Sequence, residues 1–228
     1  MQVSGVDIKI FKSKRKTVSI YIERDGSVSA RVPETITELE IQELLKAKEY
    51  QIFKHLAEWE QLHEKAVERE YVSGQSFLYL GRNYRLKFDK VEVGKLHFRK
   101  NTFFLNPTDK DKAKAKELFI KFYKEKLNQK LPEIIIRYQE QLGVQPNQIK
   151  VMELQNRWAS CTPNGNVNFH WKCAMAPIDV LHYIVVHELA HLIHNNHSKE
   201  FWNEVDKILP NYDAQIHWLK INGAGMDL

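Results

Sequence analysis

The sequence lacks three features that would place it in a specialised class of protein. Only two of its 228 residues are cysteines, Cys161 and Cys173, so it has no disulfide framework and no cysteine-based zinc finger spacing. No apolar run approaches the ~18–20 residues of a membrane span, and residues 1–16 contain no apolar signal-peptide core. We therefore expect a cytoplasmic protein that does not enter a membrane.

The overall composition is typical of a soluble globular protein, with 43% hydrophobic and 28% charged residues. The length is sufficient for one large or two modest domains. A net charge of +5 and a pI near 9.0 permit attraction to polyanions such as nucleic acid or nucleotides, without requiring it.

Alternating apolar residues predict an antiparallel, β-rich domain over residues 1–108. Residues 17–32 alternate around Asp25-Gly26, which is typical of a β-hairpin with a primed turn. A capping box at Thr37 starts a run of apolar residues at helical spacing, which predicts a long helix over 37–69. Short alternating runs between residues 77 and 105 are predicted to extend the antiparallel sheet.

The second domain is predicted to cover residues 109–228. Its pattern turns helical at Lys112, and Gly143 should end this stretch, while Pro132 should kink the helix or split it in two. Further predicted elements are strands over 149–154 and 167–171, a loop over 156–161, and a helix over 201–209.

The most informative stretch is 187–191, which has the pattern H-E-x-x-H within an apolar helical run opened by Pro177. His187 and His191 lie four residues apart on one helical face, so both imidazoles can bind one metal ion. Zinc on such ligands lowers the pKa of a bound water towards ~7, and Glu188 is placed to take its proton. The pattern predicts a zinc hydrolase; the alternative is a helix with solvated histidines.

A catalytic zinc site needs a third protein ligand, and we favour His197. His194 is on the same helical face as His187, but seven residues at ~1.5 Å rise place it about 10 Å away. Asn195-Asn196 is a candidate helix stop because asparagine tolerates the left-handed conformation, after which His197 can return to the metal. The spacing is also that of the metzincins. His194 and Glu200 are the alternatives.

Arg157 is a second catalytic candidate beside Glu188. If its loop borders the metal, the guanidinium can bind a carboxylate or phosphate, or stabilise the oxyanion that forms when water attacks. The alternative is that Arg157 pairs with a structural carboxylate. Cys161 is not expected to act as a nucleophile, because the metal already supplies one.

Several of these segments together resemble the YgjP-like metallopeptidase family, which is related to the SprT and WLM groups. The resemblance rests on Arg157–Cys161, Asn168–Lys172, Ala176–Pro177, the H-E-x-x-H motif, Asn196–Ser198 and Phe201–Trp202. Ala159 departs from it, since the family usually has glycine there. The resemblance implies an α+β fold in which a zincin-like domain, with its active-site helix beneath a small sheet, follows the β-rich domain. It also implies zinc on His187, His191 and His197, with Glu188 as the catalytic carboxylate.

The leading functional hypothesis is a zinc metallopeptidase that cleaves a peptide or protein substrate by Glu188-assisted attack of metal-bound water. A nucleotide (phosphoanhydride) hydrolase could use the same site, with Arg157 on the phosphates, although the chain has no glycine-rich phosphate loop. A third hypothesis is a non-catalytic module associated with nucleic acid. The intact Glu188 argues against it, because a structural site has no use for a general base.

Overall fold

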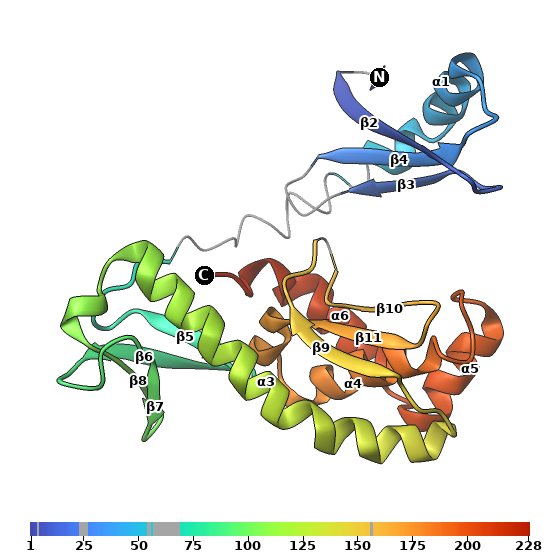
Figure 1. The fold of residues 1–228 in the computed structure, drawn as a ribbon. Coiled ribbons are helices and arrows are strands. Elements are labelled where there is room, and N and C mark those ends of the chain that lie inside the picture. Colours follow the sequence, from blue (N-terminus) through green and yellow to red (C-terminus); the bar gives the residue numbers. More distant parts are fainter. Residues whose placement is uncertain (4, 23–26, 54–55, 57–68, 156) are drawn as a thin grey trace. The chain divides into compact units, whose positions relative to one another are not determined.

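The chain forms two compact units, Met1–Ala66 and Val67–Leu228. The computed structural model describes all residues except 4, 23–26, 54–55, 57–68 and 156 (Figure 1). We expected the division after residue 108, but the strands that precede this point share one core with the helix that follows it. Phe77 and Phe103, for example, pack against Phe119 at ring-centroid distances of 4.1 and 5.2 Å.

The N-terminal unit contains a four-stranded sheet with the order β1-β2-β4-β3. Its strands are β1 (Gln2–Val3), β2 (Val6–Ser13), β3 (Ser19–Ile22) and β4 (Val28–Pro33). The predicted hairpin pair β3 and β4 is antiparallel, whereas β2 and β4 run parallel, so the expectation of a purely antiparallel sheet was wrong. The predicted turn at Asp25-Gly26 lies outside the described residues.

Helix α1 (Glu38–Ala47) begins with the predicted capping box. The Thr37 hydroxyl accepts the N–H of Glu40 at 3.3 Å, and the Glu40 carboxylate accepts the N–H of Thr37 at 2.8 Å. Lys48 interrupts the single helix that we predicted over 37–69, and helical structure resumes over 49–53. Residues 57–68 of that prediction lie outside the described part of the chain.

The C-terminal unit starts with a second four-stranded sheet, ordered β5-β6-β8-β7. Its strands are β5 (Ser76–Tyr79), β6 (Arg82–Phe88), β7 (His97–Arg99) and β8 (Thr102–Leu105). These strands were predicted to extend the N-terminal sheet, but they form a sheet of their own. The prediction of antiparallel pairing was also wrong for β6 and β8, which run parallel because β7 pairs on the outer side of β8.

A short 3-10 helix, η1 (Pro107–Asp109), leads into the 31-residue helix α3 (Lys112–Leu142). Asp111 caps its start by accepting the N–H groups of Ala113 and Lys114, and Gly143 ends it in the left-handed conformation at φ 66°. Pro132 lies within the helix without splitting it, and the course of α3 bends in Figure 1.

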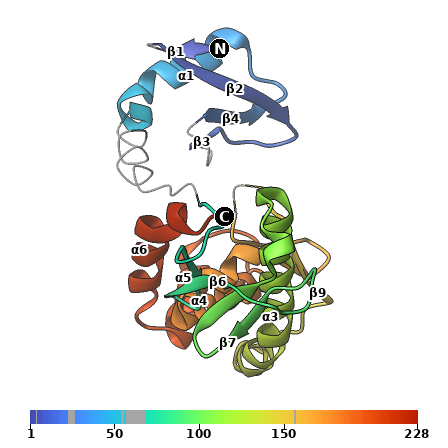
Figure 2. The ribbon, with the colours of Figure 1, turned by 90° about the vertical axis from the view of Figure 1, so that its left-hand side faces the viewer.

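A three-stranded sheet and three helices complete this unit (Figure 2). The sheet has the order β10-β11-β9 and consists of β9 (Gln148–Met152), β10 (Ala159–Cys161) and β11 (Asn166–His170). The remaining elements are η2 (Trp171–Met175), α4 (Ile178–Ala190), α5 (Lys199–Ile208), α6 (Tyr212–Asn222) and η3 (Gly223–Gly225). The predicted loop over 156–161 therefore contains strand β10, and α6 was not predicted. The fold is mixed α+β, as expected.

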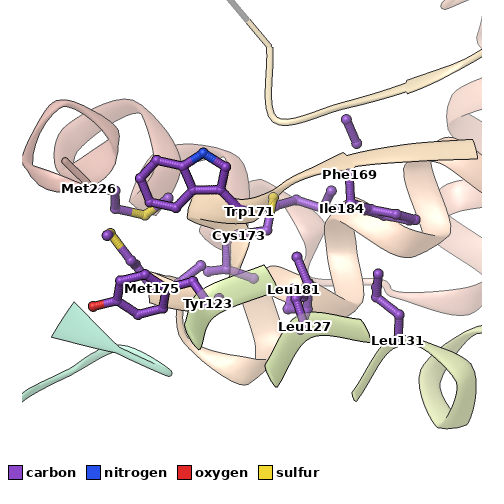
Figure 3. Packing of buried hydrophobic residues seen from close by; sticks show 14 of the residues in the cluster. Tyr123, Leu127, Leu131, Phe169, Trp171, Cys173, Met175, Leu181, Ile184 and Met226 are labelled. Carbon is purple, nitrogen blue, oxygen red and sulfur yellow. The ribbon is translucent and has the colours of Figure 1, made fainter. Parts of the chain in front are cut away.

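Helix α4 is held in the centre of this unit by apolar packing. Leu181 and Ile184 of α4 share a core with Leu127 and Leu131 of α3 and with Phe169 of β11 (Figure 3). All five side chains are at most 4% exposed. Because α4 is packed against both α3 and β11, the residues of its last turn are held in a fixed position.

The start of α4 is fixed by a close approach of two chain segments. Gly81, at φ 76°, follows β5 and donates its N–H to the carbonyl of Met175 at 2.9 Å. A Cβ atom on Gly81 would lie 2.7 Å from Cγ of Pro177, so only glycine fits here. Pro177 itself is the residue before the first turn of α4 rather than part of it.

Within the described part of the chain, no helix combines the length and the apolar character needed to cross a membrane.

Candidate metal centre

Three imidazoles converge where α4 ends. His187 lies in the last turn of α4, His191 is the residue that follows the helix, and His197 precedes α5. Nε2 of His187 is 3.0 Å from Nε2 of His197, and one ligand atom from each of the three side chains lies within 4.8 Å of the others. The structure thus brings the three predicted ligands together.

The two alternative ligands lie elsewhere. Helix α4 stops at Ala190, earlier than the predicted stop at Asn195-Asn196, and the chain turns immediately afterwards. The backbone carbonyl of His194 accepts a hydrogen bond from Nδ1 of His191 at 3.0 Å, so His194 contributes a carbonyl rather than an imidazole. Glu200 hydrogen-bonds to Ser198 at the start of α5. Neither side chain belongs to the three-histidine cluster.

The hydrogen bond behind His191 leaves its Nε2 available to a cation. A carbonyl can only accept, so Nδ1 of His191 carries the proton and its Nε2 presents a lone pair. Nδ1 of His187 lies 3.3 Å from the hydroxyl of Tyr183. Burial, with His191 and His197 adding to it, lowers the pKa of His187 to about 3. A neutral imidazole is the form that binds a metal.

Glu188 is a buried carboxyl group, 6% exposed, and its Oε2 has no hydrogen-bond partner among the described residues. Burial raises its pKa to about 8, while the charge of Arg157 and the backbone N–H of Cys161 act in the opposite direction. Cys161 belongs to strand β10, so the sheet and the helix meet at this carboxyl group.

Arg157 lies on the exposed segment before β10. Its positive charge acts on the carboxyl group of Glu188. The pKa of the Cys161 thiol is raised by burial and by Glu188, which disfavours the thiolate.

Sequence reasoning placed Phe201 and Trp202 on the helix predicted over 201–209, but it missed Tyr212 and the helix that carries it. Phe201 is fully buried and its ring centroid is within 5.0 Å of those of all three imidazoles. Trp202 stacks on His197, and Tyr212 of the unpredicted helix α6 stacks on Trp202. The signal in the sequence was the helical spacing of Tyr212, Ile216 and Leu219, which pack against the core.

The family model for the YgjP-like, metallopeptidase domain matches residues 16–222. The chain belongs to the YgjP-like metallopeptidase family. The resemblance predicted from the sequence is thereby confirmed, and family membership supports a metal-dependent hydrolase that acts on a peptide or protein. It gives no support to a nucleotide or a nucleic acid as the partner. No curated protein matches the chain.

Two solved structures of archaeal enzymes are similar to part of this YgjP-like protein. They are the metallopeptidase zymogens abylysin of Pyrococcus abyssi, at 25% identity, and jannalysin of Methanocaldococcus jannaschii, at 22%. Each similarity covers 40% of this chain and 91% of the other chain, with TM-scores of 0.36 and 0.35. At these scores the similarities establish no correspondence of individual residues.

The raised pKa of Glu188 predicts that the free energy of unfolding of the metal-free protein falls as the pH rises. Between the ordinary value of 4.5 and about 8, the folded state holds a proton that the unfolded chain has released. This contribution to stability is complete below pH 4.5 and is lost as the pH rises through 8. Glu188→Gln should therefore stabilise the metal-free protein more at about pH 8.5 than at about pH 5.5, by on the order of a few kcal/mol.

Denaturant unfolding in the presence of a chelator measures this difference. Glu140→Gln makes the same chemical change on the exposed surface of α3 and serves as the control. An equal effect of Glu188→Gln at both pH values would show that the carboxyl group is not held protonated in the folded state.

Proposed function

We propose that the protein is a zinc-dependent peptidase in which His187, His191 and His197 hold the metal and Glu188 is the general base. The observation that carries this proposal is the convergence of three imidazoles at the end of α4, where the residue after His187 is a buried glutamate whose Oε2 has no described partner. Family membership supplies the substrate class, a peptide or protein.

The donor set fits zinc. Zinc prefers imidazole nitrogen at ~2.0–2.1 Å in tetrahedral sites, so two nitrogens on one ion lie roughly 3.3 Å apart. The Nε2 atoms of His187 and His197 are 3.0 Å apart, and the third ligand atom lies within the same 4.8 Å cluster. Three protein ligands leave one position open, as in catalytic zinc sites. When bound there, zinc would polarise the scissile carbonyl and acidify water.

Glu188 is suited to moving the proton in this reaction. As water adds to the carbonyl carbon, the carboxylate takes one proton from it; as the C–N bond breaks, the carboxylic acid passes that proton to the leaving amine. A pKa near 8 when the carboxyl is buried, opposed by the charge of Arg157, keeps both protonation states accessible near neutral pH. A bound cation would oppose the effect of burial further.

Strand β10 offers a place for an extended peptide. It is an edge strand, with β11 as its described sheet neighbour. The carbonyl of Trp158 and the N–H of Thr162 bond to the β11 side, so the alternation of a strand directs the backbone groups of Ala159 and Cys161 to the open edge. Cys161 reaches Glu188 from this edge. A substrate strand that pairs with β10 would therefore pass beside the general base.

Ala159 departs from the glycine that is usual in the family. The whole residue is 8% exposed, so the added methyl group lies in a packed environment. We infer that the departure alters the packing around β10.

Arg157 is proposed to stabilise negative charge on the reacting carbonyl oxygen, or to bind a substrate carboxylate. Arg157 is exposed, it precedes the edge strand, and its positive charge acts to lower the pKa of Glu188. A guanidinium in this position can donate hydrogen bonds in a fixed fork, which an ammonium cannot reproduce.

Replacing Glu188 by glutamine should abolish peptide hydrolysis while zinc stays bound. General base catalysis contributes about 10²–10⁴-fold, so we expect at least a 100-fold loss of kcat on an unfolded protein substrate. Zinc content is measured on the same samples, and a panel of nucleoside triphosphates is assayed in parallel. Unchanged proteolysis in Glu188→Gln would contradict the proposal, as would Glu188-dependent hydrolysis of nucleotides alone.

Arg157 should affect catalysis without affecting the metal. Removal of a group that stabilises the oxyanion typically costs about 10²–10³-fold in kcat, and we expect a loss near the lower end for Arg157→Ala. Arg157→Lys keeps the charge but not the fork, and should recover only part of the activity. Equal kcat/KM in all three proteins would exclude a role for Arg157 in the reaction.

A further inference from the structure

Four aromatic side chains form a stacked series between three helices, which we call the aromatic column: His197, Trp202, Tyr212 and Tyr183. The ring of His197 stacks on Trp202 at a centroid distance of 5.7 Å, Trp202 on Tyr212 at 5.2 Å, and Tyr212 on Tyr183 at 6.4 Å. The interplanar angles are 25°, 14° and 11°.

The column starts and ends at residues of the metal centre. His197 is one candidate ligand, and Tyr183 lies one helical turn before His187, whose Nδ1 is 3.3 Å from the Tyr183 hydroxyl. Between them, Trp202 belongs to α5 and Tyr212 to α6, and both helices pack on α4 (Figure 2). The ring series therefore links His197 to Tyr183, whose hydroxyl neighbours His187.

We propose that the aromatic column positions the zinc ligands, so that Tyr183 and Tyr212 are positioning residues and α6 is a functional part of the metal centre. This inference rests on the proposed zinc site. It assigns to α6 a role beyond packing, because Tyr212 stacks on both Trp202, which contacts His197, and Tyr183, which neighbours His187.

His197 needs such support because the backbone around it provides little. It is exposed, and it lies after a run of turns and bends between α4 and α5 rather than within a helix. The imidazole is confined instead by rings: Trp202 lies parallel to it, and Phe201 meets it at 80° with a centroid distance of 4.8 Å. Without the stack, the His197 side chain would populate several rotamers, and binding the metal would then cost more side-chain conformational entropy.

Tyr183 acts on His187 through a hydrogen bond as well as through its ring. Its side chain is 7% exposed, so water competes little for the hydroxyl. When His187 presents Nε2 to the metal, its Nδ1 bears the proton and donates it to the Tyr183 oxygen. A partner at this position fixes the tautomer and the ring orientation of a ligating histidine, as outer-shell groups do in zinc sites.

Three variants separate these roles. Tyr183→Phe keeps the ring and removes the hydroxyl; Tyr212→Leu removes the middle of the column; Tyr212→Phe keeps the ring in place and is the matched control. Zinc Kd is measured by competition with a chelating dye, the Co²⁺ absorption spectrum reports ligand geometry, and the Tm of the metal-free protein reports folding. None of these readouts depends on catalysis.

We expect Kd for zinc to rise about 10-fold in Tyr183→Phe and in Tyr212→Leu, within the ~10–100-fold range of outer-shell substitutions, and to stay unchanged in Tyr212→Phe. The Co²⁺ spectrum should change in the first two variants only. An unchanged Kd and an unchanged Co²⁺ spectrum in Tyr183→Phe and Tyr212→Leu would overturn the inference. A higher Kd with an unchanged spectrum and a lowered Tm of the metal-free protein would also overturn it, because it would indicate a general loss of stability. Wild-type protein that binds no zinc would instead overturn the proposed function.

Discussion

The site depends on holding three imidazoles close together at the end of α4. Nitrogens 3.0 Å apart with lone pairs facing one another repel unless a proton or a metal ion lies between them. Desolvation lowers the pKa values of His187 and His197, which disfavours the charged imidazolium and keeps the neutral form that binds a metal. A proton on one of the two Nε2 atoms relieves this repulsion in the metal-free protein, and we propose that zinc takes its place when it binds.

Each neighbouring element contributes to maintaining these positions. The packed core fixes α4, and the contact between Gly81 and Pro177 fixes its start. The early end of α4 at Ala190 lets the carbonyl of His194 orient His191. Strand β10 supplies the N–H that bonds to Glu188, and its outer edge is where we propose that an extended substrate binds. The proposed ligands, the proposed base and the proposed substrate edge therefore all belong to one packed unit.

The local part of this arrangement could be predicted from the sequence, because helical spacing alone places His187 and His191 on one face and makes His197 a reachable third residue. The end of α4 could not, since it depends on hydrogen bonds from Leu192 and Ile193 back into the last turn. Strand β10 is only three residues long and is defined by pairing with β11, which no local pattern reveals.

The domain boundary and the parallel strand pairs were predicted wrongly for the same physical reason. They depend on contacts between segments far apart in the chain, such as the packing of Phe77 on Phe119 and the pairing of β6 with β8.

The most direct test of the central claim is the zinc affinity of His197→Ala compared with that of His194→Ala, measured against wild type. His197 is proposed to donate an imidazole, whereas His194 supplies only its backbone carbonyl, which alanine retains. We predict that His197→Ala weakens zinc binding by more than the ~10–100-fold cost of an outer-shell change, and that His194→Ala binds as wild type does. Strong loss in His194→Ala with none in His197→Ala would contradict this account of the metal centre.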